Sequence, residues 1–234
     1  MAESRHGMRP INQIGLKQQR VCEICGKPFK KSGLPMCPDA LIADCDCMQA
    51  IERTDERRRA AEENMRNAKI PRRLATLKFE SYPEDREKVD GMERYIRRPN
   101  PGLLILVGSV GRGKSSLACG VLERLAERGT VRYYYAFDLL NDRVSRETMD
   151  VMREALAPET ICIDEIGLQL KTDAAKEFME RLLIGRHDDL KNTILISNLG
   201  PDEFKPLVGT RAWDRATNDG MLLVFSGKTF RGRV

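Results

Sequence analysis

A short apolar segment that runs directly into a glycine-rich loop constrains this chain more than any other feature. The apolar run Leu103–Val107 continues into Gly108-Ser109-Val110-Gly111-Arg112-Gly113-Lys114-Ser115, followed by Ser116 and a segment of helical periodicity. This is the pattern G-x-x-x-x-G-K-[S/T] between a strand and a helix. Glycines let the backbone curl until successive N–H groups point at phosphate oxygens, and the helix adds its positive N-terminal end. Residues 108–116 are therefore predicted to bind nucleotide phosphates.

Two residues of this loop have the chemistry of specific contacts to a nucleotide. Lys114 can reach the β- and γ-phosphates of ATP, and the Ser115 hydroxyl can bind Mg²⁺. The alternative is an ordinary glycine-rich turn, but a chance match in a chain of 234 residues has a probability of roughly 1%. The strand and the helix on either side lower that probability further, so ATP and Mg²⁺ are the expected cofactors.

A second strand ends in two carboxylates. The segment Thr160–Ile163 is followed by Asp164 and Glu165, 50 residues after Lys114. Ligand sites of α/β proteins lie at the carboxyl ends of such strands. We expect Asp164 to hold Mg²⁺ through water and Glu165 to polarise the water that attacks the γ-phosphate.

A further strand, Thr193–Ser197, is followed by the amide side chain of Asn198. An amide at that position could form a hydrogen bond with the γ-phosphate or with the attacking water. Spacing alone favours the plainer interpretation, which is a turn asparagine.

Short apolar segments alternate with helical segments from residue 103 onward. The five predicted strands are Leu103–Val107, Val131–Tyr135, Thr160–Ile163, Thr193–Ser197 and Met221–Phe225. Such alternation is typical of an α/β fold in which helices cover both faces of a parallel sheet. We therefore predict a five-stranded parallel sheet, with Cys119 and Cys162 as core residues.

The composition excludes several other classes of protein. Hydrophobic residues make up 41% of the chain and charged residues 32%, as in soluble globular proteins. The longest apolar run with strand character, Leu103–Val107, is far shorter than the roughly 20 residues of a membrane helix. No apolar stretch follows Arg5 and Arg9 as it would in a secretory signal. We expect a cytoplasmic protein without a membrane partner, whose 7 cysteines are reduced thiols or metal ligands.

Five of the cysteines lie close together near the N-terminus. Cys22-x-x-Cys25 with a glycine behind it, then Cys37, then Cys45-x-Cys47, offer five thiols for four tetrahedral positions. We predict a Zn²⁺ site formed by Cys22, Cys25, Cys45 and Cys47, with Cys37 as the rival for one of the last two places. A redox C-x-x-C is disfavoured because no βαβ pattern surrounds it. A structural zinc would let a segment of about 50 residues with a thin core fold.

The charge is divided unevenly along the chain. Residues 1–73 hold 15 Lys and Arg against 10 Asp and Glu, which gives +5, and residues 74–234 hold 25 of each, which gives 0. A helix rich in Arg and Glu is expected from Met48 to about Ala68, before Pro71. We predict a zinc-binding and partner-binding module with this helix over 1–68, a linker over 69–101 and an ATPase domain over 102–234.

With these segments assembled, the chain resembles the AAA+ ATPases of the DnaC/IstB type, and most closely the DnaC-like loaders of replicative helicases. The resemblance rests on Ile163-Asp164-Glu165-Ile166-Gly167-Leu168-Gln169, Ser197-Asn198-Leu199, Val208-Gly209-Thr210-Arg211-Ala212-Trp213-Asp214-Arg215 and Gly227-Lys228-Thr229-Phe230-Arg231. It covers residues 69–234 well and the first 68 more loosely. It implies an AAA+ core that departs from the wider AAA+ pattern, because no C-terminal helical lid is expected after Val234.

The resemblance also implies roles for three residues. Asn198 matches the first sensor of the family, Arg231 the second sensor, and Arg215 the arginine finger that is donated to the nucleotide of a neighbouring subunit. A guanidinium in trans would neutralise charge on the transferred phosphoryl group and would make hydrolysis depend on self-association. Without the resemblance, a surface ion pair of Arg215 with Asp214 or Asp219 would be the preferred interpretation.

The function that the resemblance implies is ATP-dependent loading of the replicative DNA helicase onto single-stranded DNA, with ATP hydrolysis as the reaction. The N-terminal module would bind the helicase. The run Arg132-Tyr133-Tyr134-Tyr135 offers candidates for stacking on bases, although strand alternation predicts that at least one of the tyrosines is core. Two alternatives are a transposition helper that couples ATP to a transposase on duplex DNA, and a non-catalytic adaptor that ATP binding switches. Glu165 and Arg215 argue against the adaptor because both serve hydrolysis.

Overall fold

The computed structural model describes residues 27, 29–31, 41–43, 46–75, 86–145 and 147–227. The chain divides into two compact units, Met1–Glu56 and Arg57–Val234, and the division falls within helix α1 (Cys47–Asn67). In the first unit, strand β1 (Phe29–Lys31) pairs antiparallel with strand β2 (Leu41–Ala43).

The second unit alternates strands and helices, as the sequence pattern predicts. Its strands are β3 (Leu103–Gly108), β4 (Val131–Tyr135), β5 (Thr160–Ile166), β6 (Asn192–Ser197) and β7 (Met221–Phe225). Its helices are α2 (Arg72–Ala75), α3 (Arg86–Arg97), α4 (Lys114–Leu125), α5 (Ala136–Ser145), α6 (Thr148–Leu156), α7 (Asp173–Asp188), α8 (Pro201–Val208) and α9 (Thr210–Asn218), with a short 3₁₀ helix, η3, at Leu168–Lys171.

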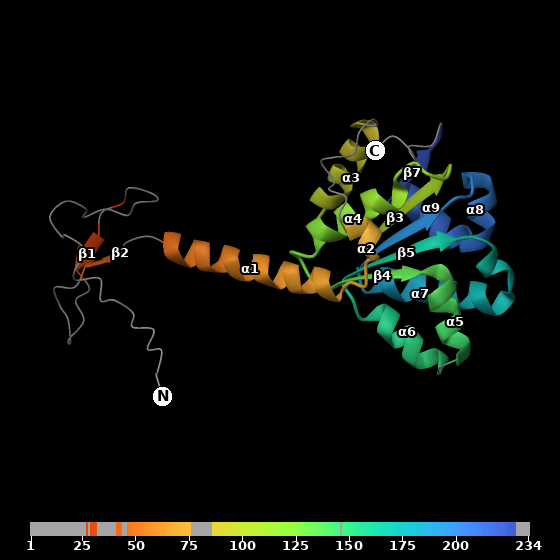
Figure 1. The fold of residues 1–234 in the computed structure, drawn as a ribbon, viewed down its shortest axis with the longest axis horizontal. Helices are drawn as coiled ribbons and strands as arrows, with labels where there is room; N and C mark the ends of the chain where they lie inside the picture. Colours follow the sequence, from red (N-terminus) through yellow and green to blue (C-terminus); the bar gives the residue numbers. More distant parts are fainter. Residues whose placement is uncertain are drawn as a thin grey trace. The chain divides into compact units, whose positions relative to one another are not determined.

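The five strands of the second unit form one sheet in the order β4-β5-β6-β3-β7 (Figure 1). Every neighbouring pair is parallel. The predicted five-stranded parallel sheet is thus confirmed. Because all five strands run the same way, the segments that follow β3, β5 and β6 emerge at one edge of the sheet. Since β6 lies between β3 and β5, the residue after β6 lies between the two segments that were predicted to bind phosphate and magnesium.

Side chains alternate between two hydrophobic cores, one on each face of the sheet. In β3, Leu104 and Leu106 belong to the core with α3 and α4, whereas Ile105 and Val107 belong to the core with helices α5 to α9. This period of two is what a strand buried on both faces requires. Helices therefore pack against both faces of the sheet, and this packing fixes the positions of the residues that follow each strand.

The segment predicted as a linker, residues 69–101, contains helix α3, which packs on the second unit. Met92 and Tyr95 of α3 have no exposed surface, and the Tyr95 hydroxyl donates a 2.8 Å hydrogen bond to the carbonyl of Gly102. Helix α3 is therefore part of the packed unit. The division into a module over 1–68, a linker over 69–101 and an ATPase domain over 102–234 remains a prediction from the sequence.

Strand β5 is longer than predicted. The sequence pattern suggests an end at Ile163, but the strand continues to Ile166, and its pairing with β6 shifts register between these two residues. A bulge of this kind absorbs an extra residue and changes where side chains point. Glu165 has a φ of 59°, in the left-handed region, and it is exposed, whereas Asp164 beside it is buried. The two carboxylates therefore lie within the strand and face different surroundings.

A buried arginine joins several segments near the amino-terminal ends of the strands. Arg186 of α7 has no exposed surface. Its guanidinium donates hydrogen bonds to the hydroxyl of Thr193 at 3.0 Å and to the carbonyls of Ala155, Pro158 and Asn192 at 3.0, 2.9 and 2.6 Å. Burial lowers the pKa of Arg186 to about 10, which still keeps the side chain charged at neutral pH.

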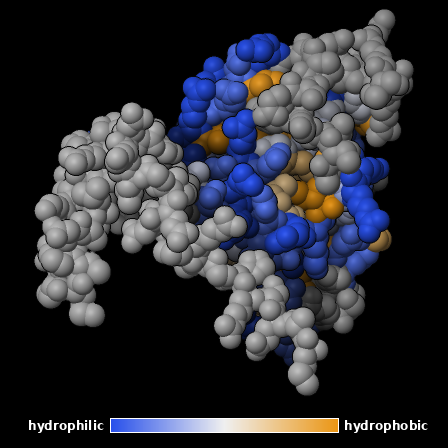
Figure 2. Space-filling view, turned by 60° about the vertical axis from the view of Figure 1, so that its left-hand side comes forward, coloured by the Kyte–Doolittle hydropathy of each residue, from blue (hydrophilic) through white to orange (hydrophobic). Residues whose placement is uncertain are grey.

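The described surface on the face shown in Figure 2 is mostly hydrophilic, with apolar residues visible only in limited areas. Among the helices that the structure describes, none combines the length and the apolar character needed to cross a bilayer.

Candidate nucleotide-binding site

The glycine-rich loop has the backbone that the sequence motif requires. Gly113, the residue before α4, has a φ of 74°, and Gly108 at the end of β3 has a φ of 112°. A Cβ atom at Gly108 would lie 2.1 Å from the carbonyl oxygen of Phe225, so a side chain has no room there. These two glycines let the chain leave the strand, close the loop and begin the helix within a few residues.

Two backbone hydrogen bonds fasten the loop to the neighbouring strands. The N–H of Gly108 donates to the carbonyl of Leu199 at 2.8 Å, and the N–H of Ser109 donates to the carbonyl of Phe225 at 2.8 Å. The loop is therefore anchored to the segment after β6 on one side and to β7 on the other. An anchored loop keeps its remaining N–H groups in place for a phosphate.

Lys114 is buried at the start of α4, and its ammonium group makes three hydrogen bonds. It donates to the carbonyls of Gly108 and Ser109 at 2.7 and 2.8 Å and to Oδ1 of Asn198 at 3.0 Å. Burial lowers the pKa of Lys114 to about 8, and the nearby Asp164 carboxylate opposes that shift. Phosphate oxygens are better acceptors for an ammonium than carbonyl and amide oxygens, so the site fits the phosphates of ATP.

The carboxylate of Asp164 accepts one hydrogen bond at each oxygen. The backbone N–H of Glu165 donates to Oδ1 at 2.6 Å, and the hydroxyl of Tyr133 on β4 donates to Oδ2. Asp164 is 4% exposed, and Tyr133 is 3% exposed. Carboxylate and hydroxyl oxygens are the ligands that Mg²⁺ takes in proteins, so Asp164 together with Ser115 fits this ion.

Most of the predicted nucleotide-site residues line one cavity of about 360 Å³. The predicted residues in its wall are Val110, Gly111, Arg112, Gly113, Lys114, Ser115, Ser116, Asp164, Glu165 and Asn198. Gly108 and Ser109 join the site through their hydrogen bonds to Lys114. The cavity thus gathers a phosphate-binding loop, two carboxylates and an amide.

Sequence reasoning missed two residues at this site. Arg73 of α2 lines the cavity and donates a 3.1 Å hydrogen bond to the hydroxyl of Tyr135, which raises the pKa of Arg73. Tyr133 was considered for stacking on DNA bases, but its burial excludes that role. Strand alternation could have indicated that Tyr133 is buried, whereas its contact with Asp164 depends on β4 pairing with β5.

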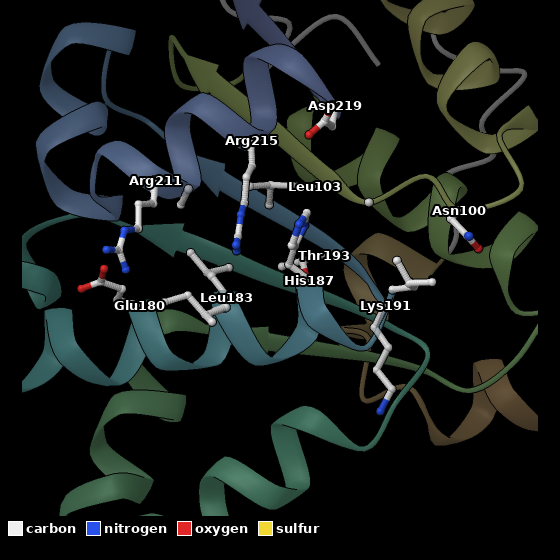
Figure 3. Close-up of a pocket in the computed structure, with 15 residues that line it drawn as sticks. Asn100, Leu103, Glu180, Leu183, His187, Lys191, Thr193, Arg211, Arg215 and Asp219 are labelled. Carbon is white, nitrogen blue, oxygen red and sulfur yellow. The ribbon is translucent and has the colours of Figure 1, made fainter.

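Arg215 lies at the other edge of the sheet, in a pocket of about 220 Å³ (Figure 3). Leu103 and Thr193, at the amino-terminal ends of β3 and β6, line the same pocket. The 6 residues from Leu103 to Gly108 span roughly 17 Å of strand. Arg215 is therefore about one strand length away from the nucleotide cavity of its own chain.

The partner of Arg215 differs from those that the sequence suggests. Its guanidinium lies 3.9 Å from the Asp188 carboxylate at the end of α7, and its side chain is 29% exposed. The side chain extends from α9 toward α7 beside His187, while Arg211 points toward Glu180 (Figure 3). An ion pair this long and partly exposed holds a side chain only weakly.

Some predicted site residues cannot be placed. Cys22, Cys25 and Cys45 and the rival Cys37 lie outside the described residues, and of Cys47 only the backbone is described. The zinc site therefore stays a prediction; within the described part of the chain, no cluster of three or more potential metal ligands is found. Arg231, the predicted second sensor, also lies outside the described residues.

Curated relatives resemble about half of this chain. The replicative helicase loader DnaC of Escherichia coli (strain K12) is 25% identical over 145 residues, which is 58% of this chain and 58% of DnaC. The uncharacterized protein YdaV of the same strain is 28% identical over 136 residues, 54% of each chain. The chain thus spans little more than half the length of these relatives.

Solved structures resemble this chain in fold over about two thirds of its length. The structures of DnaI and of the DnaC helicase loader have TM-scores of 0.57 and 0.56, each at 19% identity. They cover 70% and 67% of this chain, and 95% and 100% of the two solved chains. The fold is therefore that of the AAA+ P-loop ATPases.

The family model described as IstB-like ATP binding protein matches residues 43–224, which is more than half of the chain. Its match includes the loop, both carboxylates and Asn198. The chain belongs to the IstB-like ATP binding protein family.

Proposed function

We propose that this chain binds ATP with Mg²⁺ and hydrolyses it, and that hydrolysis serves to load the replicative DNA helicase onto single-stranded DNA. The observation that carries the first part is the single cavity shared by Lys114, Asp164, Glu165 and Asn198. A site that only stored a nucleotide would need the phosphate loop but not an exposed carboxylate next to a magnesium-binding one.

Each residue has a distinct task in this proposal. Lys114 neutralises the β- and γ-phosphates, and Ser115 and Asp164 hold Mg²⁺. The ion would neutralise charge that develops on the phosphates. Glu165 is exposed to the cavity, so its carboxylate can polarise a water molecule for attack on the γ-phosphate. Asn198 contacts Lys114 and lies where it can orient that water or the γ-phosphate.

Hydrolysis is proposed to require a second copy of the chain. Arg215 lies about one strand length from its own nucleotide cavity, so it cannot complete that site. A partly exposed guanidinium with one weak partner can instead turn toward the nucleotide of a neighbouring subunit. An arginine supplied in trans typically raises turnover about 10³–10⁵-fold. Self-association and hydrolysis would then be coupled.

The proposed partners come from the relatives. DnaC is named a replicative helicase loader, and a DnaA structure of the same fold is described as bound to AMPPCP and single-stranded DNA. The alternative of a transposition helper stays open because the matching family model is named IstB-like. The two functions share the nucleotide chemistry and differ in the partner. An adaptor that only binds ATP is the third possibility.

The first experiment tests hydrolysis. Glu165→Gln should leave ATP binding intact and lower turnover by about 100-fold or more, because the neutral amide cannot accept a proton from the water. The matched control is Glu127→Gln, an exposed carboxylate beyond the far end of α4, which should turn over ATP like the wild type. Equal turnover in the Glu165→Gln variant and the wild type would overturn the hydrolytic role.

The second experiment tests the partner. The purified chain is combined with the replicative helicase of its host and with circular single-stranded DNA, and helicase bound to the DNA is measured with ATP and without nucleotide. ATP-dependent loading that the Lys114→Ala variant does not support is the expected result. Binding to a transposase on duplex DNA in place of the helicase would favour the transposition helper.

A further inference from the structure

We propose that Tyr133 is a positioning residue for the Asp164 carboxylate and thereby sets how tightly this site holds Mg²⁺. This inference rests on the proposed function, since it concerns the magnesium that accompanies ATP. Tyr133 lies on β4, and strands β5 and β6 separate it from β3, whose carboxyl end carries the phosphate loop. It does not line the nucleotide cavity and would touch neither ATP nor Mg²⁺ directly.

The register of the sheet brings the two side chains together. Tyr133 is paired with Cys162 across the β4–β5 ladder, and Asp164 is two residues further along β5. Residues two apart on a strand point to the same face, and a diagonal neighbour lies about 7–8 Å away, within reach of a tyrosine side chain. The Tyr133 hydroxyl spans that diagonal and donates its hydrogen bond to Oδ2 of Asp164.

Two donors hold Asp164, one at each oxygen of its carboxylate. The Glu165 N–H donates to Oδ1 and the Tyr133 hydroxyl to Oδ2, so the plane of the carboxylate is fixed. Each carboxylate oxygen can accept a second hydrogen bond, so both retain acceptor capacity for a magnesium-bound water. A carboxylate that is already oriented loses less freedom when the ion binds.

The surroundings also hold the Tyr133 side chain in place. Tyr133 is 3% exposed and belongs to the core that includes Cys119 and Cys162. Its ring and that of Tyr135 pack edge to face with 5.5 Å between the ring centroids, which restricts the Tyr133 side chain further.

Loss of the hydroxyl should weaken magnesium binding and spare nucleotide binding without magnesium. In Tyr133→Phe, the ring still fills its place in the core, but Oδ2 of a buried carboxylate loses its donor. A buried hydrogen bond to a charged group is worth enough to change an equilibrium constant about tenfold or more. We expect the Mg²⁺ concentration that gives half of the maximal binding signal of an ATP analogue, or half of the maximal turnover, to rise by about that factor.

The chain offers a matched control on the same strand. Tyr134 is the next residue, faces the other core, and its hydroxyl donates a 3.3 Å hydrogen bond to the carbonyl of Glu154. Tyr134→Phe removes the same atom from the same kind of strand position without touching Asp164. It should titrate with Mg²⁺ like the wild type.

The experiment titrates Mg²⁺ into full-length protein that holds a fluorescent ATP analogue, and repeats the titration on turnover. The readout is the Mg²⁺ concentration at half-maximal effect, next to the affinity for the analogue in EDTA. A rise in Tyr133→Phe alone, with the affinity in EDTA unchanged, supports the proposal. Equal Mg²⁺ titrations for Tyr133→Phe and Tyr134→Phe overturn it, and so does an equal loss of affinity with and without Mg²⁺, which indicates a structural role.

A double-mutant cycle supplies a second test. If Tyr133 acts through Asp164, adding Tyr133→Phe to an Asp164→Asn variant should not raise the Mg²⁺ requirement further. Additive effects would overturn the proposal.

The failure of this proposal can be distinguished from the failure of the proposed function. Nucleotide binding that depends on magnesium but leads to no turnover would contradict hydrolysis, and the titrations of Tyr133→Phe and Tyr134→Phe would still decide the role of Tyr133. Turnover with the same Mg²⁺ dependence in Tyr133→Phe and in the wild type would contradict only the role of Tyr133.

Discussion

The ammonium group of Lys114 donates a 3.0 Å hydrogen bond to the side-chain oxygen of Asn198, and the two residues come from different strand ends. Lys114 follows β3 through the glycine-rich loop, whereas Asn198 follows β6, which lies beside β3 in the sheet. If ATP binds as proposed, Lys114 would turn to its phosphates and release the Asn198 amide beside the γ-phosphate. The contact therefore connects nucleotide binding to the residue expected to take part in hydrolysis.

Asn198→Ala tests that connection. The variant lacks one acceptor that holds Lys114 in the nucleotide-free protein, so the Kd for ATP should not rise. Turnover should fall at least tenfold, because an oriented hydrogen bond to the water or the γ-phosphate is lost. Equilibrium binding and steady-state kinetics separate the two quantities. A higher Kd with unchanged kcat would mean that Asn198 only supports binding.

The lowered pKa of Lys114 predicts a pH dependence of ATP binding. The free protein loses the Lys114 proton near pH 8, whereas bound phosphates would favour the charged form and raise the pKa again. Affinity should therefore be highest below pH 8 and fall by up to about tenfold per unit above it, with proton uptake on binding at pH 8.5. Calorimetry in two buffers of different ionisation enthalpy measures that uptake. Constant affinity up to pH 9 would contradict the assignment.

Arg215→Ala should spare ATP binding but abolish the turnover that depends on assembly. Lys114→Ala should abolish nucleotide binding while keeping Arg215. If the arginine acts in trans, mixing the two inactive variants should restore part of the activity, because one subunit supplies the nucleotide site and the other the guanidinium. Arg181→Ala, an exposed residue on α7 paired with Glu177, is the control and should be fully active. No recovery on mixing, or wild-type turnover of Arg215→Ala, would remove the finger role.

Arg186→Lys should destabilise the second unit by about 3 kcal/mol or more, because several buried carbonyls lose their donors. Lysine keeps the charge but lacks the planar fork that reaches these carbonyls together. Arg181→Lys on the same helix should change stability by less than about 1 kcal/mol. Urea denaturation followed by circular dichroism compares the two. A small effect at Arg186 would mean that water replaces its hydrogen bonds.

Removal of zinc tests the N-terminal prediction. Native protein should contain one zinc per chain, and a strong chelator should unfold residues 1–50 while the ATPase unit keeps its affinity for ATP. If the ligands are Cys22, Cys25, Cys45 and Cys47, then Cys22→Ser and Cys45→Ser should each lose the metal, and Cys37→Ser should retain it. Metal analysis by mass spectrometry gives the content. Native protein without zinc would refute the site.

The local features of this protein could be derived from its sequence because they depend on neighbouring residues. The glycine-rich loop before Lys114 is recognisable in any chain, since its backbone is set by glycines and its context by the flanking strand and helix. The apolar runs predicted the five strands, and β4 and β7 have the predicted bounds. Asp164 and Glu165 were predicted as a pair, although the bulge that buries one and exposes the other was not.

Contacts between segments far apart in the chain required the tertiary structure. Tyr133 and Asp164 are 31 residues apart, and Lys114 and Asn198 are 84 apart. Their contacts depend on the strand order and register of the sheet, which no single segment encodes. The same holds for Arg215, whose placement at the opposite sheet edge follows from the packing of α9. Hydrophobic periodicity specifies which face of an element is buried, but the sheet as a whole decides which side chains meet across it.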